Sequence, residues 1–292
     1  MRARRSSLSV PGSSERMLAK AAGLEADEIV VDLEDSVASD AKEQARELVG
    51  DLVVAERSLA VAVAVRINPL TSPWGERDVA DLVERAGPRI GSLVIPKVES
   101  GEDVLAVDRL LCSVGEPARG VGLQALIETA GGILRAGEIA IGSPRLEALI
   151  LGYADLAASL GRAPGPAPPE QWLHAQETVL VAARAAGLQA IDGPYLEIRD
   201  DDGLRLRAEH ARALGFDGKW AVHPGQLGII NAAFTPVHEE LVRARAILDA
   251  LARAEGRGAV ELDGEMVDEA SRKLALQVVA RGRAAGLDGV ER

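Results

Sequence analysis

The sequence predicts an α/β fold, a (β/α)8 TIM barrel followed by a C-terminal helical extension. Eight apolar runs are each followed by a helical pattern, and strands that alternate with helices form parallel sheets with right-handed crossovers. A length of 292 residues is typical of a single barrel of this kind. No Gly-x-Gly-x-x-Gly follows a strand, which weakens the alternative of an open, dinucleotide-binding sheet.

The apolar runs place the eight strands at residues 7–10, 28–33, 59–67, 92–95, 122–127, 146–151, 188–196 and 219–222. Helices are expected at residues 13–22, 40–49, 76–86, after Ser100, between the fifth and sixth strands, at 170–186, up to 214 and at 226–233. Ser100 with Asp103 three residues later is a capping signal. Segment 163–169 holds four prolines and is expected to be a long loop at the carboxyl edge of the strands.

Two domains are expected, a catalytic barrel at residues 1–236 and a helical extension at residues 237–292. The extension is expected to contain a helix at 237–254, a polar loop at 256–264 and a last helix at 266–284, with Asp268 near the start of that helix. A barrel does not need these residues, so we expect them to form a lid or an oligomerisation element.

Composition excludes several classes of partner and compartment. The net charge of −12 argues against nucleic acid or an anionic membrane as the main partner. No apolar stretch is long enough to span a bilayer, and the basic start lacks the hydrophobic region of a signal peptide. The single cysteine, Cys112, lies in an apolar helical run, which favours a buried structural thiol in a reducing compartment. The expected localisation is cytoplasmic.

Polar residues follow the apolar strands at the end where barrel enzymes carry their chemistry. Read in chain order, they are Glu34, Asp35, Arg66, Lys97, Glu128, Asp155, Asp192 and His223. Alternatives remain open for three of them. Lys97 could serve only to neutralise carboxylates, Asp192 with Gly193 fits a turn, and His223 before a proline fits a structural hydrogen bond.

Glu128 and Asp155 follow consecutive apolar strands. Because such strands are parallel and buried on both faces, their two carboxylates emerge at the same edge of the sheet. Oxygen ligands without cysteine or histidine beside them suit Mg²⁺, or Mn²⁺, better than zinc. The pair therefore predicts a divalent metal site. The alternative for each acid alone is a cap on the following helix.

Arg66 is the strand-end residue that is hardest to explain as structural. A guanidinium at the mouth of an acid-rich barrel is placed to bind a carboxylate or a developing oxyanion. Glu34 and Asp35 could hold water molecules of a metal site or orient this arginine. We assign Glu34, Asp35 and Lys97 to substrate binding together with Arg66.

Several motifs, in order over nearly the whole chain, resemble those of the citrate lyase β-subunit-like (CitE-like) proteins, on the CoA-ester lyase branch of the HpcH/HpaI aldolase family. They are VDLEDSV (31–37), VRINPL (65–70), IPKVES (95–100), LIETAGGI (126–133), GxxDLA (152–157), GFDGKWAVHPGQ (215–226), NAAFTP (231–236) and GEMVDEAS (264–271). Collectively these motifs are specific, whereas none is specific alone. The sequence departs from the resemblance at Ala154, a position that is often acidic or Asn in relatives, and in the proline-rich loop.

The resemblance implies a metal-dependent lyase that cleaves or forms the carbon–carbon bond of a 3-hydroxyacyl-CoA thioester. Substrates of the malyl-, citramalyl- or citryl-CoA type would give an acyl-CoA and a 2-oxo acid. Glu128 and Asp155 resemble the Mg²⁺ ligands, Arg66 the residue that binds the oxo acid, and Asp268 the acid/base of the tail. No organic redox cofactor is needed for this chemistry.

The resemblance also implies a homo-oligomer. Relatives form trimers or hexamers in which the tail covers an adjacent active site, so we expect Asp268 to complete the site of another subunit. As a cap of the last helix, Asp268 has a simpler alternative role.

Two other functions stay open at the level of sequence. One is a metal-dependent aldolase of free hydroxy-oxo acids, which can function with a shorter terminus. The other is a non-catalytic metabolite-binding barrel, against which the joint presence of Arg66, Glu128, Asp155 and Asp268 argues.

Overall fold

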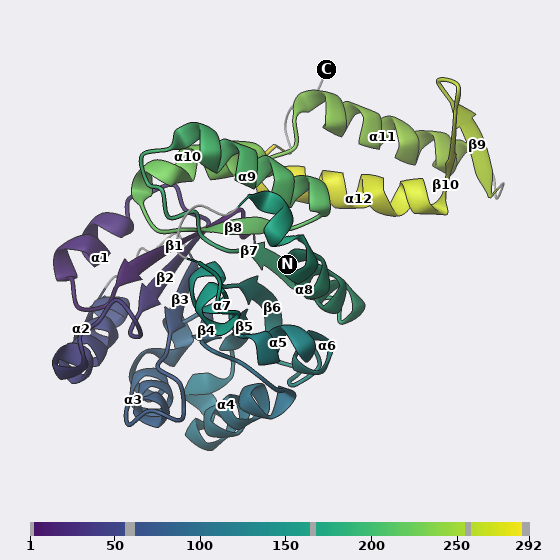
Figure 1. Cartoon of the computed structure of the whole chain (residues 1–292). Helices are drawn as coiled ribbons and strands as arrows, with labels where there is room; N and C mark the ends of the chain where they lie inside the picture. Colours follow the sequence, from purple (N-terminus) through teal and green to yellow (C-terminus); the bar gives the residue numbers. More distant parts are fainter. Residues whose placement is uncertain (1–2, 56–61, 164–167, 255–257, 288–292) are drawn as a thin grey trace. The chain divides into compact units, whose positions relative to one another are not determined.

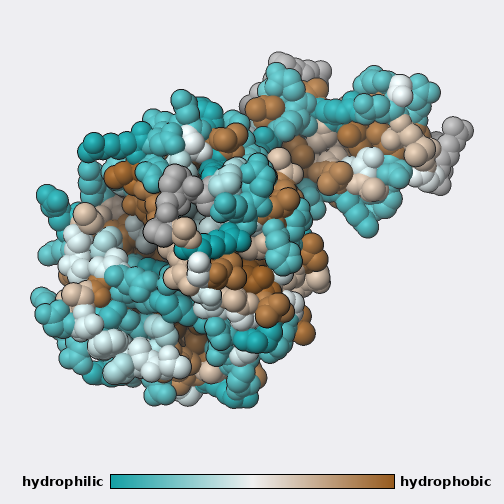
Figure 2. All heavy atoms as spheres, in the orientation of Figure 1, coloured by the Kyte–Doolittle hydropathy of each residue, from teal (hydrophilic) through white to brown (hydrophobic). Residues whose placement is uncertain are grey.

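The computed structural model describes residues 3–55, 62–163, 168–254 and 258–287. The chain divides into two compact units, one from Arg4 to Asn231 and one that begins at Ala232. The first unit is a closed barrel of parallel strands, which confirms the predicted fold (Figure 1). On the face drawn in Figure 2, the surface is largely hydrophilic and the hydrophobic residues form scattered patches.

Eight strands form the barrel in sequence order. They are β1 (Ser6–Pro11), β2 (Glu28–Asp32), β3 (Ala62–Arg66), β4 (Ser92–Ile95), β5 (Gly122–Ile127), β6 (Leu146–Leu151), β7 (Gln189–Asp192) and β8 (Gly218–Ala221). Pairing of β1 with β8, which sets Leu8 opposite Ala221, closes the sheet. The strands are buried on both faces because helices cover the outside and side chains fill the centre. One interior cluster draws on seven strands and consists of Val30, Ala64, Val94, Leu126, Ala148, Ile150, Ile191 and Trp220.

The amino-terminal end of the barrel is closed by a buried polar network that the sequence patterns did not predict. Arg4 donates from Nε to Oε1 of Glu28 at 2.9 Å. Gln124 donates to the same oxygen at 3.0 Å and to Oγ of Ser92 at 2.7 Å. Buried polar groups of this kind need mutual partners, and their position opposite the catalytic end indicates a role in stability.

Helices cover the outside of the strands (Figure 1). They are α1 (Glu15–Ala21), α2 (Lys42–Ala55), α3 (Gly75–Ala86), α4 (Gly101–Val114), α5 (Ala130–Leu134), α6 (Ala136–Ile139), α7 (Tyr153–Ser159), α8 (Leu173–Ala185), α9 (Asp201–Leu214) and α10 (Leu227–Phe234). Short 3₁₀ turns at Ser39–Ala41, Pro169–Gln171 and Pro224–Gln226 precede α2, α8 and α10. Ser100 caps α4 in a capping box with Asp103, as predicted.

The second unit contains a helix pair and a β-hairpin, α11 (His238–Arg253), β9 (Ala259–Leu262), β10 (Glu265–Asp268) and α12 (Glu269–Ala284). Helices α11 and α12 pack closely, because a Cβ added to Gly282 would lie 2.6 Å from Cδ2 of Leu241. The prediction of a loop at 256–264 and a helix from 266 is therefore wrong over the hairpin. Asp263 and Gly264 both have positive φ, 52° and 84°, as a two-residue hairpin turn requires.

Other sequence expectations need smaller corrections. Strand β7 ends at Asp192, short of the expected residue 196, and α2 runs six residues beyond the expected residue 49. Residues 59–61 of the third expected strand and 164–167 of the proline-rich loop lie outside the described residues. Cys112 is exposed on α4 rather than buried, with its Sγ 3.8 Å from Oδ1 of Asp108. Within the described ranges, no helix combines the length and apolar character needed to cross a membrane.

Candidate active site

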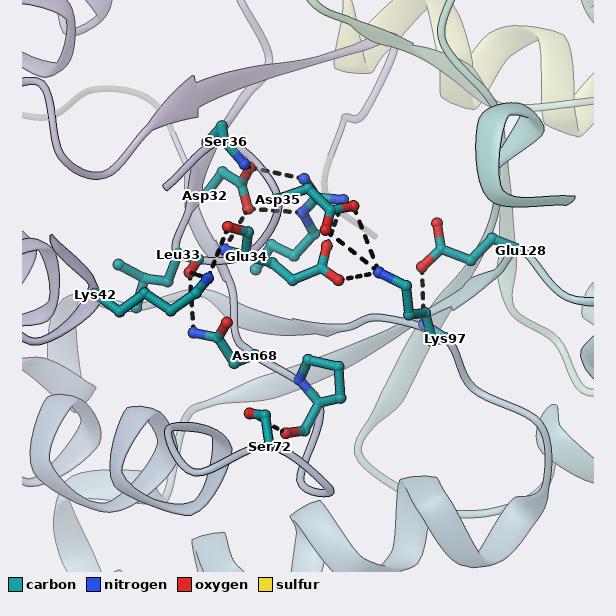
Figure 3. Close-up of polar contacts among 12 residues, drawn as sticks. Asp32, Leu33, Glu34, Asp35, Ser36, Lys42, Asn68, Ser72, Lys97 and Glu128 are labelled. Carbon is teal, nitrogen blue, oxygen red and sulfur yellow. Dashed lines mark hydrogen bonds and ion pairs between the residues drawn. The ribbon is translucent and has the colours of Figure 1, made fainter. Parts of the chain in front are cut away.

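Five of the predicted site residues gather beyond the carboxyl ends of β2 to β5 (Figure 3). They are Glu34, Asp35, Arg66, Lys97 and Glu128. Two loops hold the arrangement: the loop after β2 supplies the acids, and the loop after β4 supplies Lys97. The structure therefore brings together the strand-end residues that the sequence singled out on this side of the barrel.

Arg66 is oriented by Asp32, a residue that the sequence analysis missed. The two residues are register partners on β3 and β2. Arg66 donates from Nε and Nη2 to the two carboxylate oxygens of Asp32, each at 2.7 Å. This paired geometry is strong and directional. Asp32 is buried, which opposes ionisation, but the hydrogen bonds and charge of Arg66 hold its pKa below the usual value.

Asp32 also fixes the loop that carries the neighbouring acids. Its carboxylate accepts the backbone N–H of Glu34 at 2.8 Å and of Ser36 at 3.1 Å. Lys42 donates to the carbonyls of Leu33 and Glu34, both at 2.9 Å. Figure 3 shows these contacts converging on one short loop, so the loop is rigidly tied to β2 and α2.

Glu34 lies between two cations. Its Oε2 is 3.1 Å from Nη1 of Arg66, yet that oxygen forms no hydrogen bond among the described residues. Its other oxygen contacts Nζ of Lys97, and Asp35 is 3.4 Å from the same nitrogen. Burial raises the pKa of Glu34, and the charges of Arg66 and Lys97 oppose this rise. Burial lowers the pKa of Lys97, but the contact with Glu34 outweighs it and raises the pKa overall.

Lys97 has an uncommon backbone conformation that brings its N–H to Glu128. Its φ of 51° lies in the left-handed region that non-glycine residues seldom adopt. In that conformation its backbone N–H donates to Oε1 of Glu128 at 2.9 Å (Figure 3). Local strain of this kind is found at sites where the surrounding structure requires it. Lys97 therefore contacts acids from both sides, through its side chain and its backbone.

Glu128 is almost fully buried, with 2% of its surface exposed. Burial, followed by the negative charge of Asp155, raises the pKa of Glu128 to about 8. Asp155 is half-buried in the first turn of α7. Gly152 permits the close approach of β6, because a Cβ at this position would lie 2.7 Å from Oε2 of Glu128. The two carboxylates thus repel each other in a desolvated site.

This donor set fits a divalent cation. A cation between Glu128 and Asp155 would offset both the repulsion and the loss of water that raise the pKa of Glu128. The described residues contain no group of three or more His, Cys, Asp or Glu that could hold a metal ion. Two carboxylates without a complete protein cage are the usual arrangement for Mg²⁺, which keeps several waters and binds substrate oxygens as well.

The remaining predicted residues lie in other environments. Asp192 forms a buried ion pair with Lys219, so the interpretation as a simple turn residue is wrong. His223 accepts the N–H of Gly225 at 3.1 Å and caps a 3₁₀ turn, in agreement with its structural alternative. Asp268 caps α12 by accepting the N–H groups of Ala270 and Ser271 at 3.0 and 3.1 Å. Those hydrogen bonds, first that of Ser271, lower the pKa of Asp268.

Sequence reasoning missed Asp32, Lys219, Tyr153 and Gln176 at the barrel mouth. Asp32 was overlooked because Glu34 and Asp35 follow it and it was counted as part of the strand. Lys219 carried a usable signal, since a lysine inside a short apolar strand must find a buried acid. Tyr153 and Gln176 belong to helices, and only the fold brings them to Asp192.

Residues 5–224 match the sequence model of the HpcH/HpaI aldolase/citrate lyase family. The chain belongs to this family. It is 40% identical over 295 residues to an L-malyl-CoA/beta-methylmalyl-CoA lyase of Cereibacter sphaeroides. That alignment covers 92% of this chain and 91% of the relative. The chain is 41% identical over 286 residues to a (3S)-malyl-CoA thioesterase of the same species, with 96% and 95% covered.

Solved structures agree with this membership. CitE of Mycobacterium tuberculosis, in complex with magnesium, acetoacetate and coenzyme A, superposes with a TM-score of 0.76 at 31% identity, covering 95% of this chain and 97% of that one. A citrate lyase of Burkholderia xenovorans gives a TM-score of 0.83 at 26% identity, with 98% and 93% covered. The predicted family is confirmed, and with it the class, a carbon–carbon lyase of the CoA-ester type.

Proposed function

We propose that this protein is a Mg²⁺-dependent lyase that cleaves or forms the carbon–carbon bond of a malyl-, citramalyl- or citryl-type CoA thioester. The products of cleavage are an acyl-CoA and a 2-oxo acid. The observation that carries the proposal is the buried carboxylate of Glu128, destabilised by Asp155 and placed beside the Arg66–Asp32 pair. Relatives named for malyl-CoA and a relative bound to coenzyme A support the substrate class.

Glu128 and Asp155 are the residues that would hold Mg²⁺, or Mn²⁺ in its place. When bound, the cation supplies Lewis acidity at the oxygens of the 2-oxo acid and a template for its position. The M. tuberculosis relative contains magnesium, and the donor set of this chain fits that ion.

Arg66 supplies the positive charge for the oxo acid in this proposal. Asp32 accepts hydrogen bonds from Nε and Nη2 of Arg66. The remaining nitrogen, Nη1, is the one that Glu34 and a substrate oxygen would share. A donor fixed in this way stabilises charge without having to reorient during the reaction. Lys97 keeps Glu34 and Asp35 partly neutralised, which lowers the repulsion between these acids and an anionic substrate.

An acid/base must act at the α-carbon of the thioester. In cleavage, the 3-hydroxyl group gives up its proton to water and the carbon–carbon bond breaks. The electron pair then passes to the acyl thioester as an enolate, which takes a proton from a carboxylic acid. We assign that proton transfer to Asp268 of another subunit in a homo-oligomer, a trimer or a hexamer.

The relative named as a thioesterase defines the main competing activity. A thioesterase would give a free hydroxy acid and CoA, whereas a lyase gives an acyl-CoA and an oxo acid. An aldolase of free hydroxy-oxo acids would act without the thioester, and a non-catalytic barrel would bind without turnover.

Product analysis separates these activities. The purified protein is incubated with Mg²⁺ and malyl-CoA, citramalyl-CoA or the corresponding free acids, and all products are identified by mass spectrometry. We expect an acyl-CoA and a 2-oxo acid in equal amounts from a thioester and neither product from a free acid. Free CoA with an intact hydroxy acid, or cleavage of the free acid, would overturn the proposal.

A further inference from the structure

A second cavity of about 470 Å³ lies beside β6, β7 and β8, apart from the Arg66–Glu128 cluster. One wall is made of small side chains, Ala154, Ala157 and Ala158 of α7. The lining also includes aromatic rings, among them Trp172 and Tyr195. The cavity exists because alanines line α7, and a larger residue at these positions would fill it.

The base of the cavity is a buried polar network. Lys219 forms an ion pair with Asp192 and donates to the carbonyl of Gly193 at 2.6 Å. The hydroxyl of Tyr153 donates to Asp192 and accepts from Nε2 of Gln176 at 2.8 Å. Burial, together with the charge of Asp192, holds the pKa of Tyr153 well above its usual value. Asp192 thus accepts from both Lys219 and Tyr153, and Nε2 of Gln176 completes this network.

Two polar atoms on the cavity wall have no such partner. Oε1 of Gln176 and Nη1 of Arg162 are buried and form no hydrogen bond among the described residues. Gln176 as a whole is only 4% exposed. The guanidinium of Arg162 lies 4.2 Å from the ring centroid of Trp172, and Trp172 lies 4.9 Å from the ring of Tyr153. A buried acceptor and a buried donor without partners are unfavourable unless a ligand or water supplies them.

From these contacts we propose that the cavity takes the side chain of a 2-oxo acid larger than pyruvate. Such a side chain is planar or branched, largely apolar, and ends in a group that can hydrogen-bond to Gln176 or Arg162. The inference rests on the proposed function and extends it to thioesters whose oxo-acid part is larger than the one that malyl-, citramalyl- or citryl-CoA would release. Aromatic side chains and a wall of alanines suit a ring, and the two unpartnered atoms suit a hydroxyl on that ring.

Position favours the oxo acid over the acyl chain as the occupant. Ala154 lines the cavity and directly precedes Asp155, one of the two residues assigned to the metal. An oxo acid held at that metal would therefore lie close to the lining residue Ala154. An acidic side chain in place of Ala154 would occupy the entrance and add negative charge.

The test measures binding rather than turnover, so it stays informative if the lyase proposal fails. Glyoxylate, pyruvate, 4-methyl-2-oxopentanoate, phenylpyruvate and 4-hydroxyphenylpyruvate are titrated calorimetrically into the full-length protein with Mg²⁺. We expect the two ring-bearing acids to bind about 10- to 100-fold more tightly than pyruvate, the range that burial of one ring typically gives. The 4-hydroxyl group should tighten binding further.

Blocking variants locate the effect. Ala157→Phe, and Ala158→Leu as a second variant at an exposed position, should remove the preference for ring-bearing acids while pyruvate binding stays within about twofold. Ala185→Phe, on the exposed part of α8 away from the cavity, is the matched control and should keep the preference. Circular dichroism establishes that each variant is folded.

Three results would overturn the inference. The first is a wild-type protein that binds pyruvate and phenylpyruvate equally. The second is a blocking variant that is folded and keeps the preference. The third is a change in the affinity for acyl-CoA esters of different chain length, with oxo-acid binding unchanged, which would assign the cavity to the acyl chain. Binding that follows the prediction without any product would leave the cavity assignment standing and reject the lyase alone.

Discussion

At the residue scale, the role proposed for Arg66 depends on the planar shape of its guanidinium group. Two of its nitrogens pair with Asp32, and lysine cannot reproduce this arrangement. We expect Arg66→Lys to lose on the order of 10²- to 10³-fold in kcat/KM, as for the loss of one oxyanion donor. Arg77→Lys, at an exposed ion pair with Glu43, is the matched control. Steady-state kinetics of both variants test this, and activity of Arg66→Lys within about threefold of wild type would show that Arg66 is structural.

The raised pKa of Glu128 predicts how the stability of the metal-free protein changes with pH. Its pKa is about 8 in the folded chain against an ordinary value of 4.5. Between these values the folded state binds one more proton than the unfolded state, so stability falls as pH rises. The stabilising contribution is fully present below about pH 4.5 and is lost as pH passes through about 8.

In EDTA we therefore expect the free energy of unfolding of wild type to fall relative to Glu128→Gln between pH 5 and 8.5. The difference should reach on the order of a few kcal/mol. At the upper pH, Mg²⁺ should restore the stability of wild type but not that of the variant. Urea unfolding at a series of pH values measures these free energies. Parallel pH profiles of the two proteins would show that Glu128 is ionised throughout.

At this scale the sequence predicted the residues that end a strand but not all their partners. Arg66 and Glu128 were found because each closes an apolar run. Asp32 was missed because its role depends on the register that sets it opposite Arg66, and register is not visible in one strand alone. The left-handed backbone of Lys97 was equally invisible, since lysine gives no signal for that conformation.

At the scale of elements, the barrel strands follow from their apolar runs, whereas the hairpin β9–β10 was predicted as loop and helix. Half of the residues in its strands are exposed and only Val267 is buried, so these strands lack the apolar run on which the other strands were recognised. The signal that was available is Asp263-Gly264, a dipeptide that favours a tight hairpin turn.

The hairpin gives a prediction about stability. Gly264 has a φ of 84°, a conformation that costs a β-branched residue about 1–3 kcal/mol. We expect Gly264→Val to destabilise the second unit by that amount, measured by thermal unfolding or hydrogen exchange of β9 and β10. Glu261→Val, at an exposed position of β9, is the control, because a β-branched residue fits an extended strand. An equal effect of both substitutions would contradict the turn geometry.

At the scale of the whole molecule, the proposed acid/base belongs to the second unit, where Asp268 caps α12. We propose that Asp268 takes its catalytic role in the site of another subunit. The sequence predicted this through the resemblance of the tail, and a single chain cannot display a contact between subunits.

Complementation tests the shared site. Asp268→Asn and Arg66→Ala proteins are each expected to be inactive alone, because each lacks one half of every site. After dissociation and reassembly together, mixed oligomers should regain part of the activity, since some sites then combine an intact Arg66 with an intact Asp268. No recovery in oligomers proved to be mixed by mass spectrometry would reject the contribution of a second subunit.

The most direct measurement is Mg²⁺-dependent cleavage of a malyl-type CoA thioester by wild type, Glu128→Gln and Asp155→Asn under identical conditions. The substitutions keep the shape of each side chain and remove its charge, so the fold should persist, as circular dichroism can verify. The account predicts an acyl-CoA and a 2-oxo acid from wild type with Mg²⁺, and no turnover in EDTA or in either variant. Full activity in EDTA, or in either folded variant, would contradict it.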